Sequence, residues 1–447
     1  MNLAELLAVG VPRYTSYPTA PHFNGAITAD TVRHWLSTLP PGEPLSLYVH
    51  VPFCDSLCWF CGCHMSVVNA YGPVAAYVDL LLREIEIVAN ALGDRRPVSH
   101  VHFGGGSPTI LSPGDVARVM RDLRSRFVIL LQAEIAVEID PRGLSPASID
   151  AWAEAGVTRA SIGVQDVSPH VQLAVNRWQP VTVTRNAVAR LRAAGIKALN
   201  LDLMYGLPFQ TVENVRRTVE EATALEPQRL AVFGYAHVPD MKRHQKLIDA
   251  AALPDTAERL LQYDAAREGI TARGYQQIGL DHFAQPDDPL AQALRRGTLV
   301  RNFQGYTIDT ARTLIGLGAS AICAHAQGYA QNATDVPTYR ARIMSGSLAT
   351  ARGRALTQDD RMRRAIIERL MCDLAVDLDD LASRYGCSGD AFAAELTTLQ
   401  PLADQGMVSI DGWRVSVREQ ARVAVRLVAS TFDAYLPQSR ARHAMAV

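Results

Sequence analysis

Hydrophobic and polar residues alternate in short segments between residues 45 and 237. This period of two is typical of β-strands. Six strands are expected: LSLYVHVPF (45–53), VSHVHFGGG (98–106), EIAVEID (134–140), RASIGVQ (159–165), ALNLDLMYG (198–206) and RLAVFGYAH (229–237). Segments between them, such as YVDLLLREIEIVANAL and VTRNAVARLRAAG, carry apolar residues at helical spacing, and the second ends at Gly195 as a helix would. Six strand–helix units predict a parallel α/β sheet, either open or closed into a barrel.

The alternation within the strands distinguishes these two architectures. Polar or small side chains occupy one face of each strand, including Tyr48, His50, Glu138, Gln165 and Asp202. A doubly wound sheet buries both faces, so its strands are continuously apolar. We therefore predict an α/β fold that forms an incomplete (β/α)6 barrel, with the apolar faces under helices and the polar faces lining a ligand-filled lumen.

The alternation of strands and helices is confined to residues 45–237, and we expect four parts in the chain. They are an N-terminal arm (1–44), the partial barrel (45–240), a barrel extension on the substrate side (241–354) and a mostly helical C-terminal domain (355–447). The last has the outline of a winged helix, with a hairpin at Asp411-Gly412. It lacks a coherent basic face, so we interpret it as a structural cover for the barrel and not as a DNA-binding unit.

Composition and charge narrow the class of protein. The chain of 447 residues is 48% hydrophobic and 20% charged, with a formal net charge of -1, which favours neither nucleic acid nor a membrane surface. We find no signal peptide and no apolar run of roughly 18 residues that could span a bilayer. A cytoplasmic protein is expected. We also expect a monomer, because the sequence shows no long apolar heptad repeat and no exposed sheet edge that requires a partner. Reduced thiols then disfavour disulfides, and Cys323, Cys372 and Cys387 are predicted to be buried as small apolar residues.

Four of the seven cysteines lie in one loop, CDSLCWFCGC, at positions 54, 58, 61 and 63. Zinc ligands usually come as two separated pairs, whereas three close cysteines suit the corners of an iron–sulfur cubane. Three ligands leave a fourth iron open to a substrate, so a reactive cluster is favoured over a structural zinc or an inert cluster. Cys63, only two residues after Cys61, is interpreted as a spare thiol. The loop follows the first strand, at the strand end where α/β barrels place their active sites.

A glycine run ends the second strand, in HFGGGSPT (102–109). It would let a ligand approach the bare backbone, although a tight turn explains three glycines equally well. Nearby His50, His100 and His102 could ligate a metal, but we interpret them as hydrogen-bonded residues that line the lumen.

Together these motifs resemble the radical S-adenosylmethionine (SAM) superfamily. Within it, the chain is similar to the oxygen-independent coproporphyrinogen III oxidase (coproporphyrinogen dehydrogenase) family. The similarity runs nearly end to end, through PRYTSYPTA, YVHVPFCDSLCWFCGC, HFGGGSPT, EIDPRG, IGVQD, VNR, NLDLMYGLP, FGYAH, GLDHFA and RNFQGYT. The arm, the fourth cysteine and NFQGYT are its most specific parts.

The resemblance implies a set of site residues by position. Cys54, Cys58 and Cys61 would ligate a 4Fe–4S cluster whose open iron binds SAM. Residues implied in binding this SAM are Tyr48, Gly105, Gly106, Ser107, Glu138, Gln165, Arg177, Asp202 and Ala236. Positions linked to a second SAM are Phe60, Gln304 and Ile322, so one or two SAM molecules are expected for each site. Tyr48 and Cys63 would take part in catalysis. Ser107 replaces the threonine that is usual in relatives. Ile308 also stands where relatives have a threonine, so the polar contact that this threonine would make is in doubt.

The implied reaction converts two propionate groups of coproporphyrinogen III to vinyl groups, giving protoporphyrinogen IX in haem biosynthesis. SAM supplies a radical that removes a hydrogen atom from each propionate, and CO2 and one electron are then lost. A flavodoxin or ferredoxin is the expected electron donor, since such clusters have low potentials. Arg13 and Arg301 are candidate anchors for the substrate carboxylates. The alternative is a haem chaperone of the same superfamily, but those proteins usually lack the fourth cysteine and the arm.

Overall fold

The computed structural model describes residues 9–436, and a twelve-stranded mixed sheet forms its centre. The six predicted strands are all present, adjacent and parallel. They are β1 (Leu45–Val51), β4 (Pro97–Gly105), β5 (Val128–Ile139), β6 (Arg159–Gln165), β7 (Ala198–Tyr205) and β8 (Arg229–Gly234). Their order in the sheet follows the chain, as in a (β/α)6 barrel.

The sheet extends beyond this barrel at both edges. Beside β1 lie β13 (Thr313–Leu317), which is parallel to it, and then β14 (Ile322–Ala324), β15 (Gly328–Asn332) and β16 (Thr350–Ala355), which are antiparallel. Beside β8 lie β10 (His282–Ala284) and β9 (Gln276–Ile278). The terminal strands β16 and β9 do not pair with each other, so the barrel is incomplete, as predicted.

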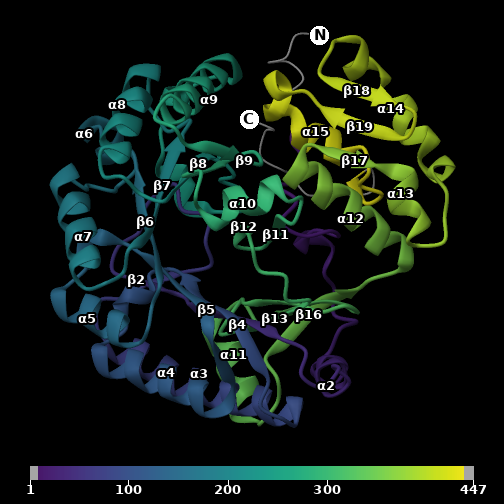
Figure 1. Cartoon of the computed structure of the whole chain (residues 1–447). Coiled ribbons are helices and arrows are strands. Elements are labelled where there is room, and N and C mark those ends of the chain that lie inside the picture. The colour runs from purple at the N-terminus through teal and green to yellow at the C-terminus, as the bar shows by residue number, and fades with distance from the viewer. Residues whose placement is uncertain (1–8, 437–447) are drawn as a thin grey trace.

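Helices cover the outer face of the curved sheet (Figure 1). They are α3 (Gly72–Leu92), α4 (Pro113–Arg126), α5 (Pro146–Glu154), α6 (Pro169–Ala174), α7 (Val181–Ala193), α8 (Val212–Thr223) and α9 (Thr256–Thr271). Gly195 adopts φ of +92° just after α7, which confirms the predicted helix end. No helix within residues 9–436 has the length and hydrophobicity needed to cross a bilayer.

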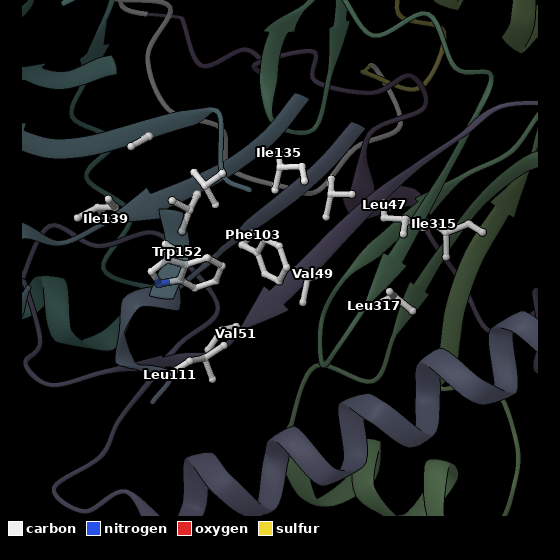
Figure 2. Packing of buried hydrophobic residues seen from close by; sticks show 14 of the residues in the cluster. Leu47, Val49, Val51, Phe103, Leu111, Ile135, Ile139, Trp152, Ile315 and Leu317 are labelled. Atoms are coloured by element: carbon white, nitrogen blue, oxygen red, sulfur yellow. The ribbon is translucent and has the colours of Figure 1, made fainter. Parts of the chain in front are cut away.

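The apolar faces of the strands form the core beneath these helices (Figure 2). Leu47, Val49 and Val51 of β1 are fully buried, and the ring of Phe103 packs edge-on against Trp152 with centroids 5.0 Å apart. Burying one such side chain contributes about 1.5–3 kcal/mol. The predicted alternation is therefore correct, and it directs the polar side chains toward the inside of the barrel.

The arm and the extension contain shorter elements. The arm holds η1 (Ala20–His22) and α2 (Ala29–Ser37), and two short strands, β2 (Phe53–Cys54) and β3 (Ser66–Val67), flank the cysteine loop. The extension holds η4 (Arg243–Leu247), η5 (Ala250–Ala252), α10 (Pro289–Arg295), β11 (Val300–Asn302), β12 (Gly305–Thr307) and α11 (Val336–Met344).

The C-terminal region has its own hydrophobic core and lies at the upper right of Figure 1. It contains α12 (Gln358–Asp373), β17 (Ala375–Asp377), α13 (Leu378–Ser383), η6 (Gly389–Phe392), α14 (Ala393–Asp404), β18 (Val408–Asp411), β19 (Arg414–Val417), η7 (Glu419–Ala424) and α15 (Val425–Ser430). The predicted hairpin is present, but Asp411 pairs with Arg414, so the turn residues are Gly412 and Trp413. Strand β17 was not predicted, because three residues are too short to show a pattern. Residues 1–8 of the arm and 437–447 of this region lie outside the described residues.

Candidate active site

The cysteine loop begins where β1 ends, at the carboxyl edge of the parallel strands. The glycine run at the end of β4 holds it there, since the N–H groups of Gly106 and Ser107 donate to the carbonyl oxygens of Val51 and Phe53, at 2.9 and 2.7 Å. A Cβ atom on Gly106 would clash with the backbone of Phe53. The glycines thus allow the backbone of the cysteine loop to pack closely against the end of β4. This role differs from the ligand contact and the tight turn that were considered from the sequence.

Side chains from distant segments hold the carbonyl groups of the loop. Asn176 Nδ2 donates to Leu57 O at 2.7 Å, and Gln245 Nε2 donates to Phe60 O at 3.1 Å. His244 Nε2 donates to Cys61 O at 2.7 Å, and Lys242 Nζ donates to Cys63 O at 2.9 Å. The loop is therefore held through its backbone carbonyl groups by side chains from outside it.

Positive charge and N–H groups surround the thiols. Arg142 Nη2 and Arg177 Nη1 lie 3.2 and 3.4 Å from Cys58 Sγ. Hydrogen bonds from the Cys63 thiol and N–H lower the pKa of Cys61, whereas burial raises the pKa of Cys54 to about 12. Such donors stabilise thiolates, the form in which cysteine binds metal.

The residues of the loop are compatible with an iron–sulfur cluster. Within residues 9–436, no three His, Cys, Asp or Glu side chains form a group that could hold one metal ion. Each cysteine of a four-iron cluster ligates a different iron, so the three thiolates need not converge on one point. The donors at Cys58 match the hydrogen bonding to sulfur that such clusters receive.

A polar cavity of about 190 Å³ lies inside the barrel, as predicted for the lumen. Three predicted site residues line it, namely Glu138, Asp202 and Gln304. The other lining residues are His102, Glu134, Ala136, Arg159, Ser161, Asn200, Arg229, Phe233, His282, Leu290, Tyr306 and Thr307.

The two lumen carboxylates differ in their protonation. Glu138 accepts from His102 Nε2 at 3.1 Å and from Gly105 N–H at 3.2 Å. Burial alone would raise the pKa of Glu138, but these donors bring it below its usual value. Burial and the nearby Glu138 charge instead raise the pKa of Asp202 to about 6, although Ser161 and Asn200 donate to it. The donors therefore favour the ionised form of Glu138, whereas burial favours the protonated form of Asp202.

Of the three predicted histidines, His50 and His102 are hydrogen-bonded, as expected, whereas His100 Nδ1 has no hydrogen-bond partner among the described residues. His50 Nε2 lies 2.9 Å from His64 O, which can only accept, so Nδ1 accepts from Tyr48 OH at 3.0 Å. The Tyr48 ring stacks on His102 with centroids 5.8 Å apart. His100 Nδ1 lies 3.1 Å from Asp309 Oδ1. This network orients Tyr48 beside Glu138.

The remaining predicted SAM-binding residues are Arg177, Gln165, Ala236 and Ser107. Arg177 is buried and donates to Gly163 O at 2.8 Å and to Asp140 Oδ2 at 3.2 Å. Gln165 ends β6 with φ of +68°, and Ala236 O accepts from Gln245 Nε2. Ser107 is buried, with its hydroxyl 3.0 Å from that of Thr109.

Phe60 and Ile322 pack against small apolar clusters and do not line the lumen cavity. Ile308 also packs against apolar residues. Cys63 and Cys387 are exposed, and Cys323 and Cys372 are buried. The prediction of burial was therefore wrong for Cys387, which follows the short helix α13 in a surface turn.

The two arginines proposed as substrate anchors lie where the arm meets the barrel and its extension. Arg13 Nη2 donates to Gly234 O at 2.8 Å. Arg301 is buried, lies over the Tyr306 ring at 4.4 Å, and faces Asp281 at 3.9 Å. Its Nε and Nη1 atoms make no hydrogen bond within the described part of the chain, and it lines a separate cavity of about 170 Å³ together with Tyr14.

Sequence reasoning missed several residues that support the loop. Arg142, Lys242, His244 and Gln245 contact it, yet none was predicted as a site residue. Arg142 was detectable, because Pro141-Arg142-Gly143 follows the carboxyl end of a predicted lumen strand. The other three have no local signal, since they lie about 180 positions from their partners in the loop.

Comparisons with known proteins agree with this geometry. A family model described as the radical SAM superfamily matches residues 48–222, and one described as the HemN C-terminal domain matches residues 356–423. The chain is 49% identical to the oxygen-independent coproporphyrinogen III oxidase of Bradyrhizobium diazoefficiens, over 98% of this chain and 97% of that one. It is 41% identical to the enzyme of that name from Pseudomonas aeruginosa, over 95% and 94%.

A solved structure shows the same fold. The coproporphyrinogen III oxidase of Escherichia coli, described as a radical SAM enzyme, has a TM-score of 0.91 and 39% identity, covering 95% of this chain and 98% of that one. Residues beyond the barrel, including the arm and the C-terminal region, are included in this similarity. The chain therefore belongs to the oxygen-independent coproporphyrinogen III oxidase family of the radical SAM superfamily.

Proposed function

We propose that this protein catalyses the oxidative decarboxylation of two propionate groups of coproporphyrinogen III, giving protoporphyrinogen IX in haem biosynthesis. In each round the propionate loses CO2, one hydrogen atom and one electron, and a vinyl group remains. The observation that carries the proposal is a three-cysteine loop with cationic support at the edge of a polar lumen, within a chain that matches named oxidases along nearly its whole length.

Cys54, Cys58 and Cys61 would hold the 4Fe–4S cluster. When bound, the cluster and SAM supply a radical able to remove hydrogen from an unactivated carbon. Arg142 and Arg177 place positive charge at Cys58, and the Cys63 N–H donates to Cys61 Sγ at 3.4 Å. These contacts offset the negative charge of the thiolates.

The lumen residues would bind SAM. Glu138, held ionised by His102, suits a cationic or hydroxyl-bearing part of SAM, and the hydroxyl of Tyr48 is oriented by His50. Gly105, Gly106, Ser107, Gln165, Arg177, Asp202 and Ala236 complete this proposed set. A second SAM would be contacted by Phe60, Gln304 and Ile322. Of these, Gln304 has direct support because it lines the same cavity as Glu138.

Arg301 would anchor a carboxylate of the substrate. The Nε and Nη1 atoms, which make no hydrogen bond among the described residues, and the place of Arg301 in a cavity beside Tyr14 support this role. The preference of guanidinium groups for carboxylates also supports it. Arg13, whose carbonyl oxygen accepts from Arg301 Nη2 at 3.3 Å, would act beside it. An anchor here would hold one end of the tetrapyrrole between the arm, the extension and the C-terminal region.

We also propose that the chain is divided into the four parts predicted from the sequence. The C-terminal part is proposed to be a winged helix. Its order α12, β17, α13, α14, β18, β19, with β19 between β17 and β18, supports this assignment. Its contacts favour a cover over the extension, since Tyr306 OH donates to Met371 O at 2.8 Å. The seven free thiols support a reducing compartment.

Anaerobic turnover tests the function. Reconstituted protein with coproporphyrinogen III, SAM and a reductant should form protoporphyrinogen IX, with 5′-deoxyadenosine as the second product. Absence of both products from protein with a full cluster would refute the oxidase. Stoichiometric haem binding without decarboxylation would favour the haem chaperone.

A further inference from the structure

The outer side of the cysteine loop is covered by one short segment, Met241–Leu247, which includes η4. Three contacts attach it to the loop, from Lys242, His244 and Gln245 to the carbonyl groups of Cys63, Cys61 and Phe60. An open depression of about 550 Å³ lies between this segment, residues 63–67 and residues 334–337. Any molecule bound in it would sit against the backbone of the cluster loop.

The surface around this depression combines positive charge with exposed apolar groups. The side chains of Arg243 and Lys246 are exposed, and no hydrogen bond or ion pair is found for them among residues 9–436. Asp240, Asp249 and Asp335 lie nearby, but Met241–Leu247 itself carries Lys242, Arg243 and Lys246 and no acidic residue. The segment therefore presents a net positive charge.

Large apolar side chains lie among these charges. Met241, Leu247 and Val67 are 63%, 57% and 41% exposed. Exposed apolar groups ringed by charge are typical of a protein-docking surface, where charge steers the encounter and apolar contact holds the complex. A nucleic acid would use the cations but would leave these aliphatic groups without a partner.

We propose that Met241–Leu247 and the outer face of residues 63–67 form the docking surface for an acidic one-electron carrier protein of the flavodoxin or ferredoxin class. The inference rests on the proposed function, which requires one electron for each SAM that is cleaved. The reduced carrier loses one electron and the cluster gains it, with no bond made and no proton moved. Docking here places the carrier on the segment that directly contacts the cluster loop, and short distances favour electron transfer.

Binding is tested with purified flavodoxin and the full-length reconstituted protein. The variant Arg243→Glu/Lys246→Glu should weaken binding about tenfold or more, since two charges change sign at the interface. The matched control is Arg190→Glu/Lys197→Glu, whose exposed side chains lie near the opposite edge of the barrel, at the end of α7 and just before β7. The control variant should bind flavodoxin as tightly as the wild type does. Added salt should weaken the binding of flavodoxin to the wild type and to the control variant. Equal affinity of wild type and the Arg243/Lys246 variant would overturn the proposal.

Turnover with two reductants separates this inference from the function itself. The Arg243/Lys246 variant should lose flavodoxin-driven turnover but keep turnover driven by dithionite, a small ion that needs no docking surface. Normal dithionite turnover also shows that the variant folds. If wild type is inactive with both reductants, the proposed function fails. If the variant binds flavodoxin normally but loses affinity for a single-stranded oligonucleotide, the surface recognises nucleic acid and the proposal is wrong.

Discussion

At the scale of single residues, Cys58 is the most strongly supported of the three proposed ligands. Two guanidinium groups, from Arg142 and Arg177, lie beside its sulfur, and both also contact Asp140. The carboxylate fixes the two guanidinium groups, so their N–H groups reach the sulfur without further ordering. Hydrogen bonds and positive charge at a cluster sulfur stabilise the reduced cluster, which carries one more negative charge.

Replacing Arg142 should therefore change the cluster potential. Arg142→Met should lower the potential by an amount on the order of tens of millivolts, because a charge-assisted donor to sulfur is lost. Arg142→Lys, which keeps the charge, should lower it less. Redox titration followed by electron paramagnetic resonance measures both values. An unchanged potential in Arg142→Met would show that this contact does not reach the cluster.

The four loop cysteines should separate into two groups. Cys54→Ala, Cys58→Ala and Cys61→Ala should each abolish the cluster, because each removes a proposed ligand. Cys63→Ala should retain it while harming turnover, since the donor to Cys61 Sγ is a backbone N–H that alanine also has. Iron content and visible absorbance of the anaerobically reconstituted variants provide the measurement. Loss of iron from Cys63→Ala would assign a ligand role to that residue.

At the scale of elements, α3 connects the end of β1 to the turn between β13 and β14. Glu84 of this helix is buried and accepts from Gly318 N–H at 2.5 Å, Tyr339 OH at 2.8 Å and Asn332 Nδ2 at 2.7 Å. Tyr77 of the same helix donates to His50 O and accepts from Ala319 N–H. The helix thereby supports His50, which orients Tyr48.

The buried Glu84 predicts a pH dependence of stability. Burial raises its pKa from 4.5 to about 7, so the folded state binds this proton more tightly than the unfolded state does. Its contribution is complete below the unfolded pKa and is lost as pH rises through the folded pKa, by up to about 3 kcal/mol. Glu84→Gln cannot titrate, so the stability of wild type relative to this variant should fall as pH rises from the unfolded pKa of Glu84 through its folded pKa.

Urea unfolding midpoints at several pH values measure this difference. Asp335→Asn is a suitable control, because Asp335 caps the neighbouring helix α11 but lies at the surface. A difference between wild type and Glu84→Gln that does not vary with pH would show that Glu84 stays ionised in the folded protein.

At the scale of the whole molecule, the N-terminal arm joins the barrel to the C-terminal region. Arg13 donates to Gly234 O of the barrel, while Tyr14 OH donates to Asp433 at 3.0 Å and Tyr17 OH accepts from Ala434 N–H at 3.1 Å. Arg426 of α15 donates to Pro12 O at 3.1 Å. The proposed substrate cavity at Arg301 is lined by residues of the arm, the extension and the C-terminal region.

Tyr14→Phe should loosen this closure. The substitution leaves one oxygen of the buried Asp433 without its donor, at a cost of about 1–3 kcal/mol. We expect faster proteolysis of the C-terminal region and a raised KM for coproporphyrinogen III, with the cluster intact. Tyr385→Phe is the control, because its hydroxyl donates to Arg361 O within the C-terminal region and makes no other hydrogen bond with the described residues. Unchanged proteolysis and KM in Tyr14→Phe would show that the arm does not close the cavity.

The barrel could be predicted because its information is local. Alternation in β1, β5, β6 and β7 separates an apolar from a polar face, and this alone assigns Glu138 and Asp202 to the inside of the barrel. The short strand β17 and the exposure of Cys387 were missed, because neither follows from a repeating pattern.

The sequence by itself determined the parallel strands, their polar faces and the three-cysteine loop, because spacing and periodicity lie within a few residues. Only the tertiary structure decided what surrounds that loop. Asn176, Lys242, His244 and Gln245 reach it from the connections after β6 and β8, between 119 and 185 positions away. Contacts across such separations depend on how strands are ordered in the sheet, and no local pattern of residues records that order.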